Sequence, residues 1–384
     1  MNSKRNKILF ISQYAGFVGG LERYIYNVAS LLKENEYRVY SLYLQEAQEK
    51  EKFLSIFDQN WTFKEIEEIS EKDFDFTTIH KISHPIILKK ILDRFSPTLF
   101  VHDHDYYCPK GFKYYPYKRI NCHRYYSRFF CAVCSSLVPP RHMTHGLKHA
   151  LRKNFIESEK LFRQAITCKS FVVLSEFMKW NLLNNGVSKE KIKIIHPFIN
   201  PPLLEKKENH DESPSQIVFA GQQVMSKGTP LFLKALSKLS SPAVVSILGS
   251  GSRLEDFKQL AKQMNLEDRV TFKGWVQNPL EVFMNSSIAV FPSLWQEPFG
   301  LTGIEAMSCG IPVVGFDVGG VSEWLKNGYN GILVPERDTT AMAGAIDQLL
   351  NDKELRKSLG KNARLSVEKN YCKQKFLNQF KNLL

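Results

Sequence analysis

The sequence predicts an α/β protein made of two doubly wound domains that face each other across a cleft. Short apolar runs, typical of buried strands, alternate with amphipathic helical stretches along most of the 384 residues. This alternation predicts parallel sheets covered by helices on both faces. A polar, proline-punctuated stretch between residues 197 and 215 interrupts the alternation and is typical of a linker. Two large domains also suit a chain of this length.

The N-terminal half begins with a strand, a glycine-containing loop, a helix and a second strand. We expect the first strand at residues 7–12, the loop at 15–20, a helix through residues 24–32 and the second strand at 37–43. The same pattern predicts further strands at residues 77–79, 98–101, 170–174 and 192–195. These elements form a Rossmann-like domain over residues 1–200, with a basic, cysteine-containing insertion near residues 108–163.

The C-terminal half repeats the alternation after the linker, which we place at residues 201–214. Strands are expected at residues 217–220, 244–248, 270–272, 288–291 and 312–315. They define a second Rossmann-like domain over residues 215–365. Residues 366–384 are expected to form a final helix that packs back on the N-terminal domain.

The charge of the chain is strongly basic and unevenly placed. The formal net charge is +13, and residues 110–163 hold twelve of the basic side chains but only two acidic ones. Such a segment suits an anionic partner or a membrane surface. No apolar run reaches the roughly 18 residues that span a bilayer, and the apolar run after Met1 is too short for a signal peptide. We therefore expect a cytoplasmic protein.

The most informative stretch is residues 291–312, where a strand, a loop and a helix follow one another. The loop carries Glu297, and the helix begins near Gly300. The first-turn N–H groups of Gly300, Leu301 and Thr302 would be free to bind an anion such as a phosphate. Glu305 lies one turn further along the same face. A carboxylate there suits a hydroxyl group next to that phosphate, and Glu297 would meet the other end of the same ligand.

This stretch resembles, nearly residue for residue, the Glu-x7-Glu motif of retaining glycosyltransferases in family four of the carbohydrate-active enzymes, which have the GT-B fold. The resemblance implies that Glu305 holds the ribose of a nucleotide sugar and that Glu297 faces the sugar. It also implies that the turn formed by Phe299, Gly300, Leu301 and Thr302 lies against sugar and diphosphate. A nucleotide-diphosphate sugar, with a UDP-sugar favoured, is then the donor.

Other segments resemble the same family along nearly the whole chain. Gly19 and Gly20 look like the first glycine loop, whose backbone approaches the diphosphate. Lys227 matches the lysine that neutralises the leaving diphosphate, whereas Gln222 stands where the family usually has an arginine. The loops near the diphosphate and the base are expected at Gly249, Gly274 and Trp275.

Two histidines at the ends of neighbouring predicted strands are candidate catalytic residues. His80 resembles the family's histidine that contacts the sugar near the reacting carbon, and His102 begins a segment like the His-Asp loop of one branch. A structural role for either histidine is the alternative. Residues 73–75 and 103–105 both match Asp-x-Asp, the metal site of the other large glycosyltransferase class. Because Lys227 and a helix terminus already supply positive charge, we expect no metal requirement for catalysis.

The sequence thus predicts transfer of a sugar, with retention of configuration, to a glycan or lipid-linked acceptor in cell-surface polysaccharide or glycoconjugate synthesis. The basic, aromatic insertion suits an anionic or membrane-borne acceptor and peripheral attachment to the inner face of the membrane. Two alternatives remain open. One is a nucleotide-sugar epimerase or phosphorylase of the same fold, and the other is a basic nucleic-acid-binding protein, although we expect no nucleic-acid partner.

Four cysteines of the insertion form a candidate structural zinc site. Their spacing ends in a Cys-x2-Cys pair, the chelating pattern of many zinc sites. The four residues are Cys108, Cys122, Cys131 and Cys134. His123 could replace one thiol, an iron–sulfur cluster would use the same ligands, and four unligated cysteines are the remaining alternative.

Overall fold

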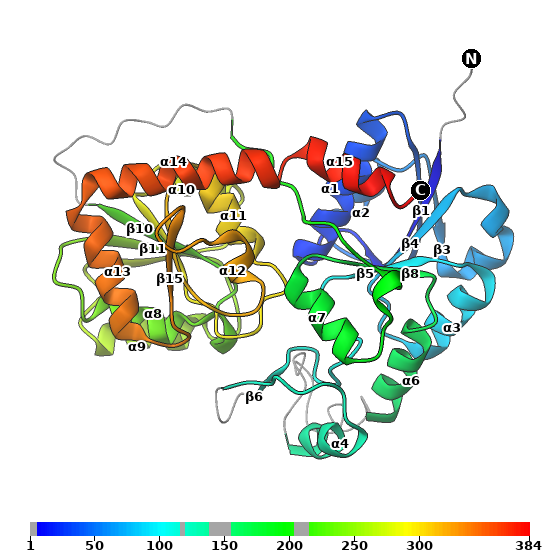
Figure 1. Cartoon of the computed structure of the whole chain (residues 1–384), viewed down its shortest axis with the longest axis horizontal. Helices are drawn as coiled ribbons and strands as arrows, with labels where there is room; N and C mark the ends of the chain where they lie inside the picture. Colours follow the sequence, from blue (N-terminus) through cyan, green and yellow to red (C-terminus); the bar gives the residue numbers. More distant parts are fainter. Residues whose placement is uncertain (1–5, 116–119, 138–154, 203–214) are drawn as a thin grey trace. The chain divides into compact units, whose positions relative to one another are not determined.

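The computed structural model describes residues 6–115, 120–137, 155–202 and 215–384, which form two compact units (Figure 1). Unit 1 contains Met1–Lys113, His123–Pro197 and Phe376–Leu384, and unit 2 contains Tyr114–Cys122 and Phe198–Lys375. Each unit has its own parallel sheet with helices on both faces. The prediction of two doubly wound α/β domains is therefore confirmed. The predicted linker lies largely outside the described residues.

The sheet of unit 1 has seven parallel strands in the order β3-β2-β1-β4-β5-β8-β9. Their bounds are Lys7–Ala15 (β1), Arg38–Glu46 (β2), Gln59–Thr62 (β3), Phe76–His80 (β4), Thr98–Val101 (β5), Ser170–Val173 (β8) and Ile192–Ile194 (β9). The central strand β1 is apolar on both faces, and residues 8–11 are at most 1% exposed, because helices cover both sides. The strand order reverses between β1 and β4, and ligands of open parallel sheets usually bind beyond the carboxyl ends of the strands at such a point.

Successive side chains of each strand point to opposite faces of this sheet, and a different set of helices packs on each face. On one side lie α3 (Pro85–Arg94), α6 (Phe155–Ala165) and α7 (Glu176–Asn184), which share a buried cluster with Leu9, Ile79 and Leu99. The other side carries α1 (Gly20–Glu34), and α2 (Lys50–Leu54) contacts β1. Helix α4 (Arg128–Leu137) contacts α6. None of the described helices combines the length and apolar character needed to cross a bilayer.

The sheet of unit 2 has six parallel strands in the order β12-β11-β10-β13-β14-β15. Their bounds are Gln216–Ala220 (β10), Val244–Leu248 (β11), Val270–Gly274 (β12), Ile288–Phe291 (β13), Val313–Phe316 (β14) and Gly331–Val334 (β15). The helices are α8 (Thr229–Leu236), α9 (Leu254–Gln263), α10 (Pro279–Met284), α11 (Leu301–Ser308), α12 (Val321–Trp324), α13 (Thr339–Asn351) and α14 (Lys353–Asn370). Here the strand order reverses between β10 and β13, which are the strands that precede the Lys227 and Glu297 loops.

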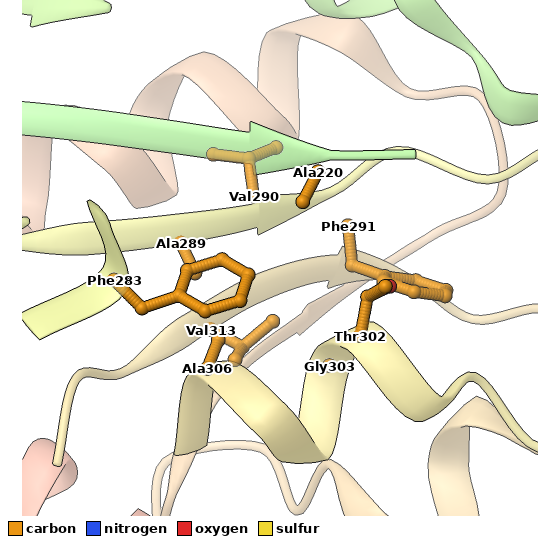
Figure 2. Close-up of a pocket in the computed structure, with 9 residues that line it drawn as sticks. All are labelled: Ala220, Phe283, Ala289, Val290, Phe291, Thr302, Gly303, Ala306 and Val313. Atoms are coloured by element: carbon orange, nitrogen blue, oxygen red, sulfur yellow. The ribbon is translucent and has the colours of Figure 1, made fainter. Parts of the chain in front are cut away.

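Helix α11 packs directly on the strands of this sheet. Figure 2 shows Thr302, Gly303 and Ala306 of α11 around a small apolar pocket, together with side chains of β13 and β14. The pocket leaves about 10 Å³, the lower limit for a single water molecule, so it is a packing defect beneath the helix and not a nucleotide site. A side chain on Gly303 would collide with Trp324, whose ring lies 2.1 Å from the ideal Cβ position. Glycine therefore lets the helix and this indole pack closely.

The C-terminal segment is two helices, where the sequence suggested one. Helix α14 ends at Asn370 and α15 spans Lys373–Lys381. The break occurs at Tyr371, whose carbonyl accepts a hydrogen bond from the Ile199 N–H at 2.8 Å instead of serving a continuing helix. Beyond the break, the Phe380 ring lies 5.8 Å from that of Phe76 in β4, and residues from Phe376 onward belong to unit 1.

A short hairpin inside the predicted insertion belongs to unit 2, although the chain on both sides of it belongs to unit 1. Its strands are β6 (Tyr114–Tyr115) and β7 (Ile120–Asn121), which pair antiparallel. The segment Tyr114–Cys122 is called the insertion hairpin below. The remainder of the insertion includes α4 and the start of α6, and residues 138–154 lie outside the described part of the chain.

Candidate active site

The carboxyl ends of the unit 2 strands bring the predicted donor-site loops together. Lys227 belongs to the loop after β10, and Glu297 belongs to the loop after β13. These two strands pair with each other, Ile217 opposite Ile288, although seventy residues separate Lys227 from Glu297. The two side chains therefore meet at the point where the strand order reverses, the usual ligand position in an open parallel sheet.

Glu297 is buried and held by two donors. Its side-chain oxygen Oε1 accepts hydrogen bonds from Lys227 Nζ at 2.6 Å and from Ser293 Oγ at 2.6 Å, and the residue is 4% exposed. The Gly320 N–H binds the Glu297 carbonyl at 2.8 Å. Gly319, at φ +58°, packs so closely that an added Cβ would lie 2.3 Å from the same carbonyl oxygen. The carboxylate thus has a fixed position and a charged partner.

Lys227 is positioned by contact between the two loops. The residue after it, Gly228, has φ +82° and lies against the Pro292 carbonyl with no room for a side chain, and the Leu294 N–H bonds to the Ser226 carbonyl at 2.8 Å. The Lys227 ammonium also lies 5.1 Å from the centre of the Trp295 ring, a cation–π distance. With a side chain 22% exposed, Lys227 connects the buried carboxylate to the surface of the unit.

The glycine loops after β10, β11 and β12 pack backbone against backbone at the same edge of the sheet. The Gly249 N–H binds the Gly274 carbonyl at 2.6 Å, and a Cβ on Gly249, at φ +109°, would lie 2.1 Å from the Gly221 carbonyl oxygen. Trp275, which follows Gly274, is 68% exposed. Three of the predicted donor-site loops are therefore neighbours, and an aromatic side chain projects into solvent beside them.

The two glutamines after Gly221 differ in role. Gln222, at the family's usual arginine position, is exposed. Gln223 is fully buried, donates to the Gly221 carbonyl at 2.8 Å and accepts from Thr229 Oγ1 at 2.9 Å. Gln223 therefore ties the loop to the start of α8, a structural role that the sequence did not suggest.

The helix of the Glu-x7-Glu stretch begins as predicted, at Leu301 after Gly300, which has φ +101°. Glu305 lies in α11 and is half-buried. The side chain of Phe299, the first residue of the turn predicted to lie against the donor, is 1% exposed and packs 5.4 Å from the Tyr371 ring. Its carbonyl accepts a hydrogen bond from Trp324 Nε1 at 2.6 Å. Its side chain therefore anchors the turn in the core.

In unit 1, the two candidate histidines form a pair. His80 Nδ1 lies 3.1 Å from His102 Nε2, and the His80 ring is stacked between the rings of Phe10 and Phe100. His80 is fully buried and its Nε2 finds no hydrogen-bond partner among the described residues, whereas His102 is half-buried. Burial lowers the pKa of both, to about 4 for His102, so both imidazoles are neutral near pH 7.

Lys81 follows the first histidine and was missed by the sequence reasoning. It has φ +50°, and its ammonium contacts the carboxylates of Asp103 at 2.7 Å and Asp105 at 2.5 Å. Both aspartates of this Asp-x-Asp pattern thus hold a lysine. Because strands β4 and β5 are adjacent, a contact between Lys81 and residues 103–105 could have been predicted from the sequence. Gly19 and Gly20 follow β1 in this unit, and the Glu22 carboxylate accepts from the Gly19 N–H at 2.9 Å.

The predicted zinc site is not supported. No three cysteine, histidine or carboxylate side chains gather as a metal-ligand set in the part of the chain that the structure describes. Cys131 and Cys134 both lie within helix α4, where Cys131 Sγ accepts from the Ser127 N–H. Cys122 lies in the insertion hairpin of unit 2, and Cys108 belongs to unit 1. The Cys-x2-Cys spacing is here the three-residue spacing of one helix face, not a chelating turn.

Comparison with known sequences identifies two family models that together match most of the chain. Residues 18–202 match "Glycosyltransferase Family 4" and residues 202–366 match "Glycosyl transferases group 1". One relative, the N-acetyl-alpha-D-glucosaminyl L-malate synthase of Bacillus anthracis, is 36% identical over 141 residues, which is 37% of this chain and 37% of that protein. An uncharacterized glycosyltransferase of Methanocaldococcus jannaschii, MJ1178, is 24% identical over 362 residues, 93% of this chain and 92% of that one.

Comparison with solved structures shows the same fold. Anabaena Alr3699/HepE, solved in complex with UDP and glucose, superimposes with a TM-score of 0.73 over 99% of both chains. The sequences are 16% identical. The likeness therefore extends over the entire two-unit architecture.

Proposed function

Since the chain belongs to the GT-B glycosyltransferases of family four, we propose that it transfers a sugar from a nucleotide-diphosphate sugar with retention of configuration. The acceptor is a glycan or a lipid-linked sugar. The observation that carries this proposal is the Lys227–Glu297 pair, whose 2.6 Å contact lies where the strand order of unit 2 reverses. The pair brings a cation for a departing diphosphate next to a carboxylate for a sugar that gains positive charge.

The proposed chemistry is mainly electrostatic. As the bond between the sugar and the diphosphate breaks, the Lys227 ammonium and the first N–H groups of α11 stabilise the charge that develops on the leaving group. Glu297, held by Lys227 and Ser293, faces the oxocarbenium-like sugar. The acceptor hydroxyl attacks from the face that the diphosphate leaves, and its proton passes to the departing phosphate oxygen, which accounts for retention.

The donor is proposed to be a UDP-sugar. HepE, which shares the fold, was solved with UDP and glucose, and the exposed Trp275 beside Gly274 offers an aromatic surface for a base. Glu305 on α11 is the proposed ribose ligand. The catalytic contribution of unit 1 is assigned to His102, which has exposed surface, and His80 behind it orients the ring.

The proposed acceptor is borne by an anionic membrane surface on the inner face of the membrane. Helix α4 and the residues before it expose the side chains of Tyr125 (65%), Phe129 (72%), Phe130 (51%) and Val133 (45%). The Arg124 guanidinium lies 4.6 Å from the centre of the Phe130 ring. Aromatic side chains beside arginines are typical of peripheral membrane attachment, because the rings enter the interface while the cations meet anionic headgroups.

The test starts with a thermal-shift panel of uridine, guanosine and adenosine diphosphates and their sugars, followed by mass spectrometry of any donor that is turned over. We expect stabilisation by UDP and a glycosylated product only when an acceptor is added, with the anomeric configuration of the donor retained in nuclear magnetic resonance spectra. Isomerised or phosphorolysed donor without an acceptor would instead identify an epimerase or phosphorylase. Steeply salt-dependent binding of RNA, without nucleotide-sugar turnover, would contradict the proposal.

A further inference from the structure

The insertion hairpin (Tyr114–Cys122) is bonded to the loop that carries Glu297. We propose that this hairpin is a positioning element for the Glu297 carboxylate during glycosyl transfer. The inference rests on the proposed function for its catalytic consequence, although the structural support itself is independent of substrate. The described residues of the hairpin, 114–115 and 120–122, are assigned a positioning role and no contact with the reacting atoms.

The first bond joins the hairpin to the residue immediately before Glu297. Gln296 Nε2 donates to the Cys122 carbonyl at 2.7 Å, and Gln296 is 1% exposed. The next residue, Glu297, is bonded to Lys227 and Ser293. Consecutive side chains of one loop are thus fixed to two separate anchors. Such a double attachment restricts rotation of the loop and hence the direction of the carboxylate.

The second bond fastens the hairpin to the end of another strand. Asn121 is 8% exposed, and its Nδ2 donates to Glu336 Oε1 at 3.0 Å. Glu336 follows β15, which is separated from β13 by β14 alone. Within the hairpin, Cys122 Sγ lies 3.4 Å from Tyr115 Oη and links its two arms. The hairpin is therefore anchored to the loops after β13 and β15, on both sides of β14.

The chain leading into the hairpin is itself firmly held in unit 1. Lys113 is 3% exposed and its Nζ donates to Asn181 Oδ1 in α7 at 2.6 Å. One covalent segment thus runs from unit 1 into the hairpin, which is hydrogen-bonded to the Glu297 loop. Reacting groups must be held within about 0.5 Å of the productive geometry, so an attachment of this kind can govern turnover without contacting substrate.

The test disrupts the Asn121–Glu336 hydrogen bond with one substitution and restores a hydrogen bond there with a second substitution. Asn121→Asp places a carboxylate against Glu336 and replaces a hydrogen bond with repulsion. Glu336→Gln alone keeps an amide oxygen that Asn121 can still bind, and in the double variant the new glutamine amide can donate to the new aspartate. Gln296→Met, which keeps the side-chain length but loses the donor, removes the first bond independently.

Two measurements on the full-length chain decide the proposal. Hydrogen exchange of residues 293–299, measured without substrate, should be at least tenfold faster in Asn121→Asp and in Gln296→Met, and should return to the wild-type rate in the Asn121→Asp, Glu336→Gln double variant. Turnover should fall about tenfold in the two impaired variants, as expected for a modestly misplaced group. The affinity for UDP in calorimetry should remain within twofold of wild type, because the two bonds removed here end on Gln296 and Glu336, neither of which is a proposed nucleotide ligand.

The outcomes distinguish this inference from the proposed function. Unchanged exchange in both Asn121→Asp and Gln296→Met overturns the positioning role, as does faster exchange with full turnover. Failure of the double variant to restore exchange also overturns the assigned Asn121–Glu336 contact. If the wild-type protein turns over no donor, the proposed function fails, and the catalytic role of the hairpin fails with it, whereas the exchange data still establish or refute the structural attachment.

Discussion

Removing the Lys227 ammonium should both destabilise unit 2 and slow the reaction. In Lys227→Met the side chain keeps its approximate length, but Glu297, which is 4% exposed, loses its ion-pair partner. Breaking a buried ion pair by removing one partner costs about 3–5 kcal/mol. Two features reduce that value here. Ser293 still donates to the same carboxylate oxygen, and the 22% exposure of the lysine side chain means that water can take its place.

We therefore expect a loss of about 2 kcal/mol in the free energy of unfolding of Lys227→Met. In a unit of this size that corresponds to about 4–8 °C in the midpoint of its thermal transition. Glu297→Gln removes the charge that needs neutralising, so the Lys227→Met, Glu297→Gln double variant should recover most of the loss. The double-mutant cycle should give a coupling of about 2 kcal/mol between the two residues.

The assay is urea unfolding of wild type, both single variants and the double variant at pH 7.5. Lys234→Met is the matched control, because Lys234 is an exposed lysine on α8 and its loss should change stability by less than about 0.5 kcal/mol. In turnover measurements, Lys227→Met should be about a hundredfold slower, as for loss of a charge stabiliser, and Glu297→Gln should lower turnover more than UDP affinity. Strictly additive stabilities, or a Lys227→Met variant as active as the control, would refute the reasoning.

Three further predictions concern other parts of the site. Glu305→Ala should weaken UDP binding more than tenfold in calorimetry, since hydrogen bonds to charged groups contribute about 1.5–3 kcal/mol, and unchanged affinity would contradict the ribose assignment. Burial lowers the pKa of His102 to about 4 in the folded protein, whereas in the unfolded chain it is near 6.5, so the unfolded chain is protonated first as the pH falls. Between pH 7 and pH 5 the free energy of unfolding of wild type should therefore fall by about 2 kcal/mol more than that of His102→Asn. An equal pH dependence of the two in urea unfolding would refute that sign and size. A Phe129→Ser, Phe130→Ser variant should sediment less with anionic vesicles than wild type at low salt, whereas equal sedimentation of both proteins would argue against α4 as the membrane contact.

The parallel sheets and the gathering of glycine loops could be predicted from sequence. Strands such as β1 and β10 are short continuous apolar runs, the pattern of strands buried on both faces. Once the strands are parallel, the loops after them must lie at one edge, although the choice of Gly249 and Gly274 as donor-site residues came from the family resemblance. The His80–His102 pair could be predicted nearly as easily, because β4 and β5 are consecutive in the chain and adjacent in the sheet.

The Lys227–Glu297 contact could not be derived from periodicity, because it depends on β10 pairing with β13, two strands that are not consecutive. Only the resemblance to a known family brought the two residues into one site. The direction of a side chain could not be derived from periodicity either. Phe299 belongs to the turn predicted to lie against the donor, and its side chain packs in the core against the ring of Tyr371, more than seventy positions later.

The zinc prediction, which the described residues do not support, relied on a spacing that has two physical meanings. A Cys-x2-Cys pair in a turn presents two thiolates to one metal ion, but in a helix the same interval is one of the neighbour spacings on a face. The surrounding residues of α4 favour the helix, since Phe129, Phe130 and Val133 carry an apolar pattern within Arg128–Leu137. An amphipathic helix in a basic segment is also the pattern expected of a membrane contact, so two of the four predicted metal ligands, Cys131 and Cys134, lie on the helix that the membrane proposal uses.

The charge arrangement at the Glu297 loop explains why that loop needs more than one anchor. An ammonium has three donors, and Lys227 gives one of them to Glu297, which leaves others for a diphosphate. In the proposed reaction a phosphate group would draw Lys227 toward itself, and the Glu297 carboxylate, which would face the sugar, must not follow the lysine. Ser293 retains one bond to Glu297, and Gln296 retains the loop through the Cys122 carbonyl. In the proposed reaction, with Gln222 in place of the family's usual arginine, Lys227 would carry a larger share of the leaving-group charge, and the independent support of Glu297 would become correspondingly more important.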